Sequence, residues 1–214
     1  MSTVLVKSFP QRETDLKEIL RYAGVGGDGI AEETLRLAEE CIRLCCGRLR
    51  HDVCYAEFSV KITGDLCDLG FAIYKSESLA RCLSECGKIV VFAATVGLEL
   101  DRLIAGFGNT APSRAHMLQA VGAERIESLC DSFCDFVRSE YGDTRPRFSP
   151  GYGDFPLEAQ REIFRVLDPS RRIGLSLSDT LLMSPTKSVT AIVGVKREKA
   201  SKSEGYGDFP LCGK

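Results

Sequence analysis

The six residues from Arg147 to Tyr152 read RFSPGY and combine side chains suited to binding a small anionic ligand. Arg147 supplies a fixed cation that can hold a carboxylate through two parallel hydrogen bonds. Pro150 has a fixed φ and no N–H and keeps Ser149 extended, whereas Gly151 can adopt a positive φ. Tyr152 adds a flat aromatic face with a polar end. By itself the run is also typical of an ordinary turn before a helix.

Two predicted helices flank this run and must position it. Residues 112–141 carry an apolar stripe at helical spacing and end at Tyr141-Gly142, a typical C-cap signal. Gly122 lies inside that stripe and costs about 1 kcal/mol relative to alanine, which predicts close backbone packing at this point. A second helix is predicted at about residues 157–167 and stops at Asp168-Pro169.

The remaining chain alternates predicted strands and helices, which indicates an α/β or α+β fold. Residues 89–94 (IVVFAA) form a continuous apolar run and are predicted to be a buried central strand. Further strands are predicted at 53–62, 69–74, 180–184 and 188–196, the last two joined by Pro185-Thr186-Lys187. Further helices are predicted at 12–22, 31–46, 78–86 (capped by Ser76 or Ser78) and 98–105.

Composition places the chain among ordinary globular proteins. It has 214 residues, of which 44% are hydrophobic and 27% charged, enough for one large domain or two small ones. The net charge of -2 argues against a general nucleic-acid binder, which needs a basic face. No apolar run reaches the roughly 18 residues of a membrane helix, and the N-terminus lacks a signal peptide. We therefore expect a cytoplasmic protein.

The ten cysteines are unusual for such a protein. Three pairs have i,i+4 spacing, which on a helix places both residues on one face: Cys41/Cys45, Cys82/Cys86 and Cys130/Cys134. Cytoplasmic thiols stay reduced, and no Cys-x-x-Cys pair is present. We interpret these cysteines as small apolar core residues. The alternative, a metal or redox site, requires two of the pairs to converge in space.

Residues 145–195 resemble the reactivation domain of cobalamin-dependent methionine synthase. That domain binds S-adenosylmethionine on an Arg-x-x-Pro-Gly-Tyr loop, followed by a helix and by a hairpin with a Pro-x-x-Ser-Val turn. The matching pieces here occur in the same order and at the same spacing, and the preceding residues are more similar to short, free-standing relatives of the domain. The pieces are Arg147, Pro150, Gly151, Tyr152, Pro156, Ile173–Leu177 and Pro185–Val189.

The resemblance implies an α+β fold with a mixed, largely antiparallel sheet flanked by helices. It implies three regions. Residues 1–110 are an N-terminal helical and strand region of the same fold, residues 111–197 are the S-adenosylmethionine-binding core, and residues 198–214 are a mobile tail.

The resemblance also implies the roles of individual residues. Arg147 pairs with the methionine carboxylate, and Ser149 and Gly151 offer backbone groups to the adenosine part. Tyr152 lines the site, and Glu127 receives the ligand's amino group. Glu124 is the alternative acid, and Tyr206 is a weak candidate for a tyrosine contact from the tail. No catalytic residue or metal ligand of the chain itself is implied.

The resemblance implies that the chain is the reactivation partner of a cobalamin-dependent methionine synthase. It would then be an accessory domain or subunit of that methyltransferase and not a separate enzyme. It presents S-adenosylmethionine to the partner's cobalamin while a flavodoxin- or ferredoxin-type reductant supplies an electron. One alternative is a non-catalytic small-molecule or redox-sensing module that uses the cysteines. Another is a stand-alone S-adenosylmethionine-dependent methyltransferase, which the sequence disfavours because VGGDG (25–29) precedes the first clear strand.

One sequence repeat has no explanation at this level. The heptapeptide GYGDFPL occurs at Gly151–Leu157 and again at Gly205–Leu211. The second copy lacks the preceding arginine and proline, and seven residues are too few for a repeat architecture.

Overall fold

The computed structural model describes residues 2–27 and 29–197. Three features predicted from the sequence lie outside the described residues. They are the tail at 198–214, the second GYGDFPL copy with Tyr206, and Asp28 of the VGGDG run.

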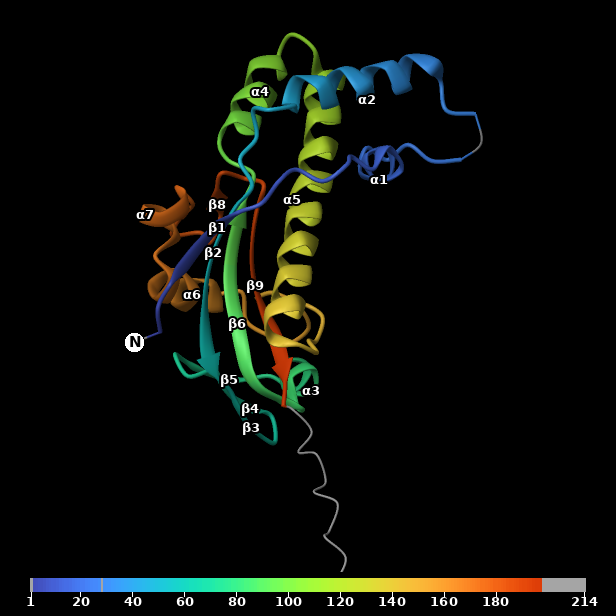
Figure 1. Cartoon of the computed structure of the whole chain (residues 1–214). Coiled ribbons are helices and arrows are strands. Elements are labelled where there is room, and N and C mark those ends of the chain that lie inside the picture. The colour runs from blue at the N-terminus through green and yellow to red at the C-terminus, as the bar shows by residue number, and fades with distance from the viewer. Residues whose placement is uncertain (1, 28, 198–214) are drawn as a thin grey trace, which may run out of the picture.

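The main sheet has four antiparallel strands in the order β1-β2-β6-β9. It takes three strands from the first half of the chain and β9 from the end of the described part, next to β6. Helices flank the sheet, so the predicted α+β class with a largely antiparallel sheet is confirmed (Figure 1). The strands are β1 (Leu5–Ser8), β2 (Asp52–Ser59), β6 (Cys86–Thr95) and β9 (Ser188–Lys196).

Strand β6 contains the predicted buried strand, and its position explains why residues 89–94 are all apolar. Val90 and Phe92 point into one hydrophobic core, and Ile89 and Val91 point into a second core on the other face of the sheet. Alternate residues of a strand face opposite sides, so a strand covered on both sides needs apolar residues at every position. The prediction of a central strand at 89–94 is therefore confirmed.

The helices form two layers, one for each core. Helices α1, α2, α4 and α5 supply buried residues to the first core, and α3, α6 and α7 supply them to the second. The long α5 runs alongside the sheet and continues beyond it to meet α1, α2 and α4 (Figure 1). The helices are α1 (Leu16–Tyr22), α2 (Glu32–Cys45), α3 (Glu77–Leu83), α4 (Glu99–Phe107), α5 (Pro112–Tyr141), α6 (Ala159–Leu167) and α7 (Pro169–Ile173).

Two of the predicted strands in the first half of the chain are wrong in extent. The strand predicted at 53–62 is interrupted at Val60, and the second part belongs to a small sheet of β3 (Lys61–Thr63), β4 (Leu66–Asp68) and β5 (Ile73–Lys75). The strand predicted at 69–74 is mostly the turn between β4 and β5. Gly70 makes this turn with φ +77°, and its N–H donates to the Asp68 carboxylate at 2.9 Å.

The predicted strands at 180–184 and 188–196 are present but do not pair with each other. The first is reduced to β8 (Met183–Ser184), which pairs with β7 (Ser176–Leu177), whereas β9 pairs with β6. The prediction of a hairpin with the Pro-Thr-Lys-Ser-Val turn is therefore wrong. The connection is held elsewhere, because Thr186 donates its N–H (2.8 Å) and its hydroxyl (2.5 Å) to Asp101 on α4.

Most cysteines of the described residues are buried, which supports their interpretation as small apolar core residues. Cys41 and Cys45 are buried on α2, and burial raises the pKa of each thiol to about 11. The pair Cys82/Cys86 does not share a helix, because α3 ends at Leu83 and Cys86 begins β6. Within residues 2–27 and 29–197, no cluster of His, Cys, Asp and Glu is arranged to hold a metal ion. Thiols with raised pKa are weak nucleophiles, which disfavours redox sensing by these buried cysteines.

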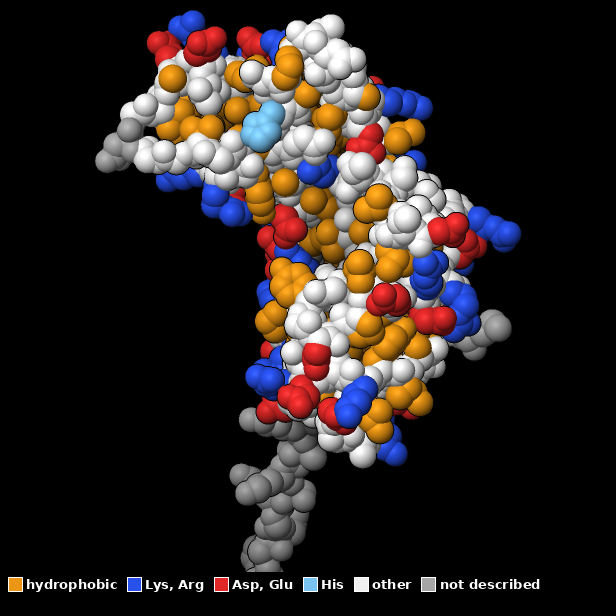
Figure 2. All heavy atoms as spheres, turned by 180° about the vertical axis from the view of Figure 1, so that it is seen from behind, with side chains coloured by type: hydrophobic (Ala, Val, Ile, Leu, Met, Phe, Trp, Pro, Cys, Tyr) orange, Lys and Arg blue, Asp and Glu red, His pale blue; other side chains and the backbone are white. Residues whose placement is uncertain are grey.

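The surface carries charges of both signs. Figure 2 shows acidic and basic side chains interspersed over one face of the molecule, without a continuous basic surface. Among the helices of the described part, none combines the length and apolar character needed to cross a bilayer.

Gly122 is tightly packed against neighbouring side chains. A Cβ at this position would overlap Leu100 Cδ2 on α4 and would lie 2.9 Å from Lys187 Cγ. The contact partners are side chains of α4 and of the connection before β9, and not the backbone that we expected.

We expect Gly122→Ala to lower the free energy of unfolding by about 1–3 kcal/mol, because relief of the overlap moves α4 away from α5. Gly106→Ala on α4 is the matched control, since nothing lies within 4 Å of a Cβ added there. Alanine is the better helix former, so that variant should gain up to about 1 kcal/mol. Urea unfolding of both variants measures the difference, and a gain in both would contradict the close packing.

Candidate functional site

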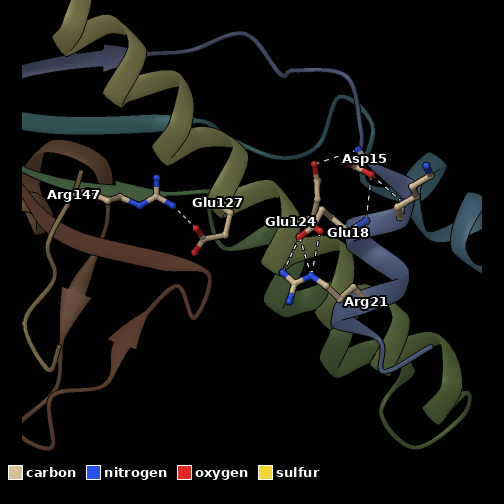
Figure 3. Close-up of polar contacts among 7 residues, drawn as sticks. Asp15, Glu18, Arg21, Glu124, Glu127 and Arg147 are labelled. Atoms are coloured by element: carbon tan, nitrogen blue, oxygen red, sulfur yellow. Dashed lines mark hydrogen bonds and ion pairs between the residues drawn. The ribbon is translucent and has the colours of Figure 1, made fainter. Parts of the chain in front are cut away.

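The RFSPGY loop is held at the outer edge of β9. The N–H of Arg145 donates to the carbonyl of Gly194 and the N–H of Phe148 donates to that of Ile192, each at 2.8 Å. Arg147 lies between these two anchored residues, so its backbone has little freedom. Its side chain extends across to α5, as Figure 3 shows.

Arg147 is held between two carboxylates of α5. Its guanidinium forms an ion pair with Glu127 and another with Asp131, the latter at 2.5 Å. Glu127 and Asp131 are four residues apart and so share one face of the helix. Burial by itself would lower the pKa of Arg147, but the hydrogen bond to Asp131 and the charge of Glu127 outweigh it and raise the pKa. The guanidinium therefore stays charged.

Some backbone groups of the Pro-Gly turn form hydrogen bonds within the turn and with Phe155. Gly151 adopts φ +90° and donates its N–H to the carbonyl of Phe155 at 2.9 Å. The N–H of Tyr152 donates to the carbonyl of Ser149 at 3.2 Å. The Ser149 N–H and the Gly151 C=O make no hydrogen bond within the described part of the chain. Those two groups therefore remain free of internal partners within that part.

A groove runs along α5 beside the loop. One part is a cleft of about 680 Å³ whose lining includes Arg12, Asp131, Arg147 and Tyr152. A second part of about 320 Å³ contains Glu127 and shares Arg12 and Asp131 with the first. Tyr152 is 70% exposed, so its ring is available at the mouth of the groove. Neither Ser149 nor Gly151 lines either part.

Glu127 and Glu124 lie in different environments, although they are one helical turn apart. The side chain of Glu127 is 44% exposed and points to Arg147. Glu124 is buried, forms an ion pair with the buried Arg125 and accepts the N–H of Asp15 at 3.3 Å. Both acids line the second part of the groove, but of the two only Glu127 can meet a ligand without breaking interior contacts.

Sequence reasoning missed the other parts of this groove. Asp131 was detectable, because it lies four residues after Glu127 on a predicted helix. The N-terminal segment was not, because it reaches α5 only through the fold. Arg125 donates to the carbonyl of Arg12 at 2.8 Å and to that of Glu13 at 3.3 Å, which fixes this segment along α5.

The first GYGDFPL copy (Gly151–Leu157) connects the loop to the start of α3. The Asp154 carboxylate accepts hydrogen bonds from the Ser76 hydroxyl (2.6 Å) and from the N–H groups of Glu77 (2.7 Å) and Ser78 (3.1 Å). It thereby caps α3. Phe155 is buried in the second core. The heptapeptide thus ties the loop to α3, which the sequence alone did not reveal.

Asp154 gives a pH-dependent contribution to stability. The Ser76 hydroxyl and the two N–H groups lower the pKa of this carboxyl below its ordinary value. A depressed folded-state pKa means that the stabilisation is present above the unfolded-state pKa and is lost as the pH falls through the folded-state pKa. Asp154→Asn should therefore melt at a lower temperature than wild type near neutral pH, and the gap should narrow below about pH 4.

Thermal unfolding from neutral to strongly acidic pH measures this gap. Asp179→Asn is the control, because the Asp179 carboxylate makes no hydrogen bond or ion pair within residues 2–27 and 29–197. It should change the melting temperature little at any pH. A gap for Asp154→Asn that stays constant across the acid range would show that the carboxylate contributes through shape and not through charge.

Comparison with known proteins reveals a likeness in structure only. No protein-family model matches the sequence, and no curated protein matches it significantly. The crystal structure of the MetH reactivation domain bound to AdoHcy superposes with a TM-score of 0.67 and 16% sequence identity. The match covers 93% of this chain and 80% of that one. At this identity the likeness establishes the fold, which is that of the MetH reactivation domain.

Proposed function

We propose that this chain binds S-adenosylmethionine in the groove along α5 and presents it to a cobalamin carried by a methionine synthase partner. The observation that carries the proposal is the arrangement of Arg147 between Glu127 and Asp131 at an accessible groove. The methionine part of the ligand is a zwitterion. Its carboxylate suits Arg147, and its amino group suits Glu127.

The likeness to a reactivation domain bound to AdoHcy supports this choice of ligand, since AdoHcy is what remains of S-adenosylmethionine after methyl transfer. In the proposed role the partner's cobalamin would accept the methyl group once a flavodoxin- or ferredoxin-type reductant has supplied one electron. The chain itself needs no general base for this task. Its residues bind the ligand and hold the methyl group toward the partner.

Binding would change the partners of Arg147. Its terminal nitrogens are engaged by Glu127 and Asp131, one each, and its side chain is 26% exposed. A ligand carboxylate would compete with these acids for a guanidinium whose five N–H groups they do not all use. When the carboxylate takes the place of Glu127, that acid becomes free to receive the ligand's amino group, so the charges in the groove stay balanced.

Calorimetric titration of the chain with S-adenosylmethionine tests the ligand, and an anaerobic assay tests the partner. In the assay, methionine synthase that holds cob(II)alamin and lacks its own reactivation domain is mixed with a reductant, S-adenosylmethionine and this chain. We expect saturable binding and recovery of activity that depends on the chain. Absence of binding in the presence and absence of the partner would reject the ligand. Binding without recovery would reject the partner.

A further inference from the structure

A second cleft lies far from the RFSPGY loop, at the opposite edge of the main sheet. The loop is anchored beyond β9, whereas this cleft is next to β1 and the end of β2. It has a volume of about 790 Å³, within the range of ordinary small-molecule sites. Its walls are the N-terminal segment before β1, the β4–β5 turn and the helices α6 and α7.

One wall of this cleft is aromatic and apolar. The rings of Phe58 and Phe71 lie 4.9 Å apart between centroids and are tilted by 58°. Val4 and Val166 also line the cleft. All four are half-buried over the second core, so they are held firmly while one side faces the cavity. A flat apolar ring can pack on such a surface.

The charged side chains that line the cleft are both cations. They are Arg165 and Arg172, and no carboxylate of the described residues lines the cavity. Arg165 is partly neutralised by Glu162 at 2.6 Å and also donates to the carbonyl of Phe71 at 3.4 Å. Arg172 forms no ion pair within the described residues and makes only a 3.3 Å hydrogen bond to the carbonyl of Val4 across the cleft. A guanidinium so placed can exchange a weak bond to a carbonyl for a charge-assisted bond to an anion.

We infer that this cleft binds a small molecule with a flat aromatic ring and an anionic group, either a phosphate or a carboxylate. The ring packs on Phe58 and Phe71, and the anion pairs with Arg172 and with the terminal nitrogen of Arg165 that Glu162 and Phe71 leave unused. This site is separate from the groove along α5 and does not depend on the proposed function.

The chain contains a matched control for the key residue. Arg171 is the immediate neighbour of Arg172 and has the same charge, but it does not line the cleft and instead pairs with Asp168 at 3.6 Å. Both arginines are exposed, so neither substitution removes core packing. Arg171→Ala and Arg172→Ala therefore change the net charge equally, but only Arg172→Ala changes the lining of the cavity.

Naphthyl phosphate, naphthoate, naphthol and inorganic phosphate are suitable probes, followed by calorimetry or by naphthyl fluorescence with the full chain. We expect saturable binding of at least one of the two aromatic anions, with the tighter one identifying the anion class. Arg172→Ala should weaken this binding about tenfold or more, and Arg171→Ala should leave it within about twofold. Naphthol and inorganic phosphate should bind much more weakly, because each lacks half of the recognised chemistry.

Three outcomes would overturn the inference. They are no saturable binding of either aromatic anion, equal losses in the Arg171 and Arg172 variants, and binding of naphthol as tight as that of the anions. Arg147→Ala distinguishes the two sites, since it should leave naphthyl phosphate or naphthoate binding unchanged. Loss of binding in that variant would place the probe in the α5 groove and reject the second site.

Discussion

Arg147→Ala should reduce the affinity for S-adenosylmethionine about ten- to a hundredfold. The substitution removes a charge-assisted pair with the ligand carboxylate, for which about 1.5–3 kcal/mol is expected. It also leaves Glu127 and Asp131 without their shared cation, so the groove becomes more acidic and repels the carboxylate. Calorimetric titration of the variant against wild type measures the loss. Arg165→Ala, in the other cleft, should bind S-adenosylmethionine as wild type does.

Substitution of the two acids beside Arg147 should affect the affinity for S-adenosylmethionine differently. Asp131→Asn removes one competitor for the guanidinium and should leave the affinity equal or a few-fold tighter. Glu127→Gln removes the acid assigned to the ligand's amino group and should weaken binding. A mere loss of loop rigidity would weaken both variants alike. If Asp131→Asn and Glu127→Gln lose affinity equally, the assignment of Glu127 fails.

Arg125→Met should lower the free energy of unfolding by about 3–5 kcal/mol, the largest stability effect that we expect. The Arg125 side chain is only 2% exposed and forms an ion pair with Glu124, whose side chain is 6% exposed. Without Arg125, that carboxylate is buried and unpaired. The carbonyls of Arg12 and Glu13 also lose their donors, so the N-terminal segment should detach from α5. Urea unfolding measures the first effect, and limited proteolysis near residues 9–15 measures the second.

The double variant Glu124→Leu/Arg125→Met separates charge from anchoring. Replacement of both partners of a buried pair by apolar residues is often neutral or stabilising, so the double variant should be more stable than Arg125→Met. The N-terminal segment should nevertheless remain sensitive to protease, because its carbonyls still lack donors. A double variant as unstable as the single one would mean that the stability comes from the contacts to Arg12 and Glu13 and not from the pair.

Local signals were sufficient for most elements of the fold. Ser76, one of the two predicted candidates, caps α3, α5 covers the whole of the predicted 112–141, and the apolar run at 89–94 is the central strand. These elements are specified by side chains within a few residues of one another. The predictions for 53–62, 69–74 and the hairpin at 180–196 were wrong, because the limits and partners of those strands depend on Gly70 and on the contact between Thr186 and Asp101.

The sequence by itself determined the chemistry of the RFSPGY loop, since a cation, a fixed proline and a positive-φ glycine are properties of residue types in a row. It also placed Glu127 on the helix that precedes the loop. Only the tertiary structure decided that Arg147 meets both Glu127 and Asp131, that Glu124 is buried with Arg125, and that Arg12 closes the groove. Such contacts join residues up to 113 positions apart. They arise from the packing of α5 against the sheet and the N-terminal segment, which no local pattern encodes.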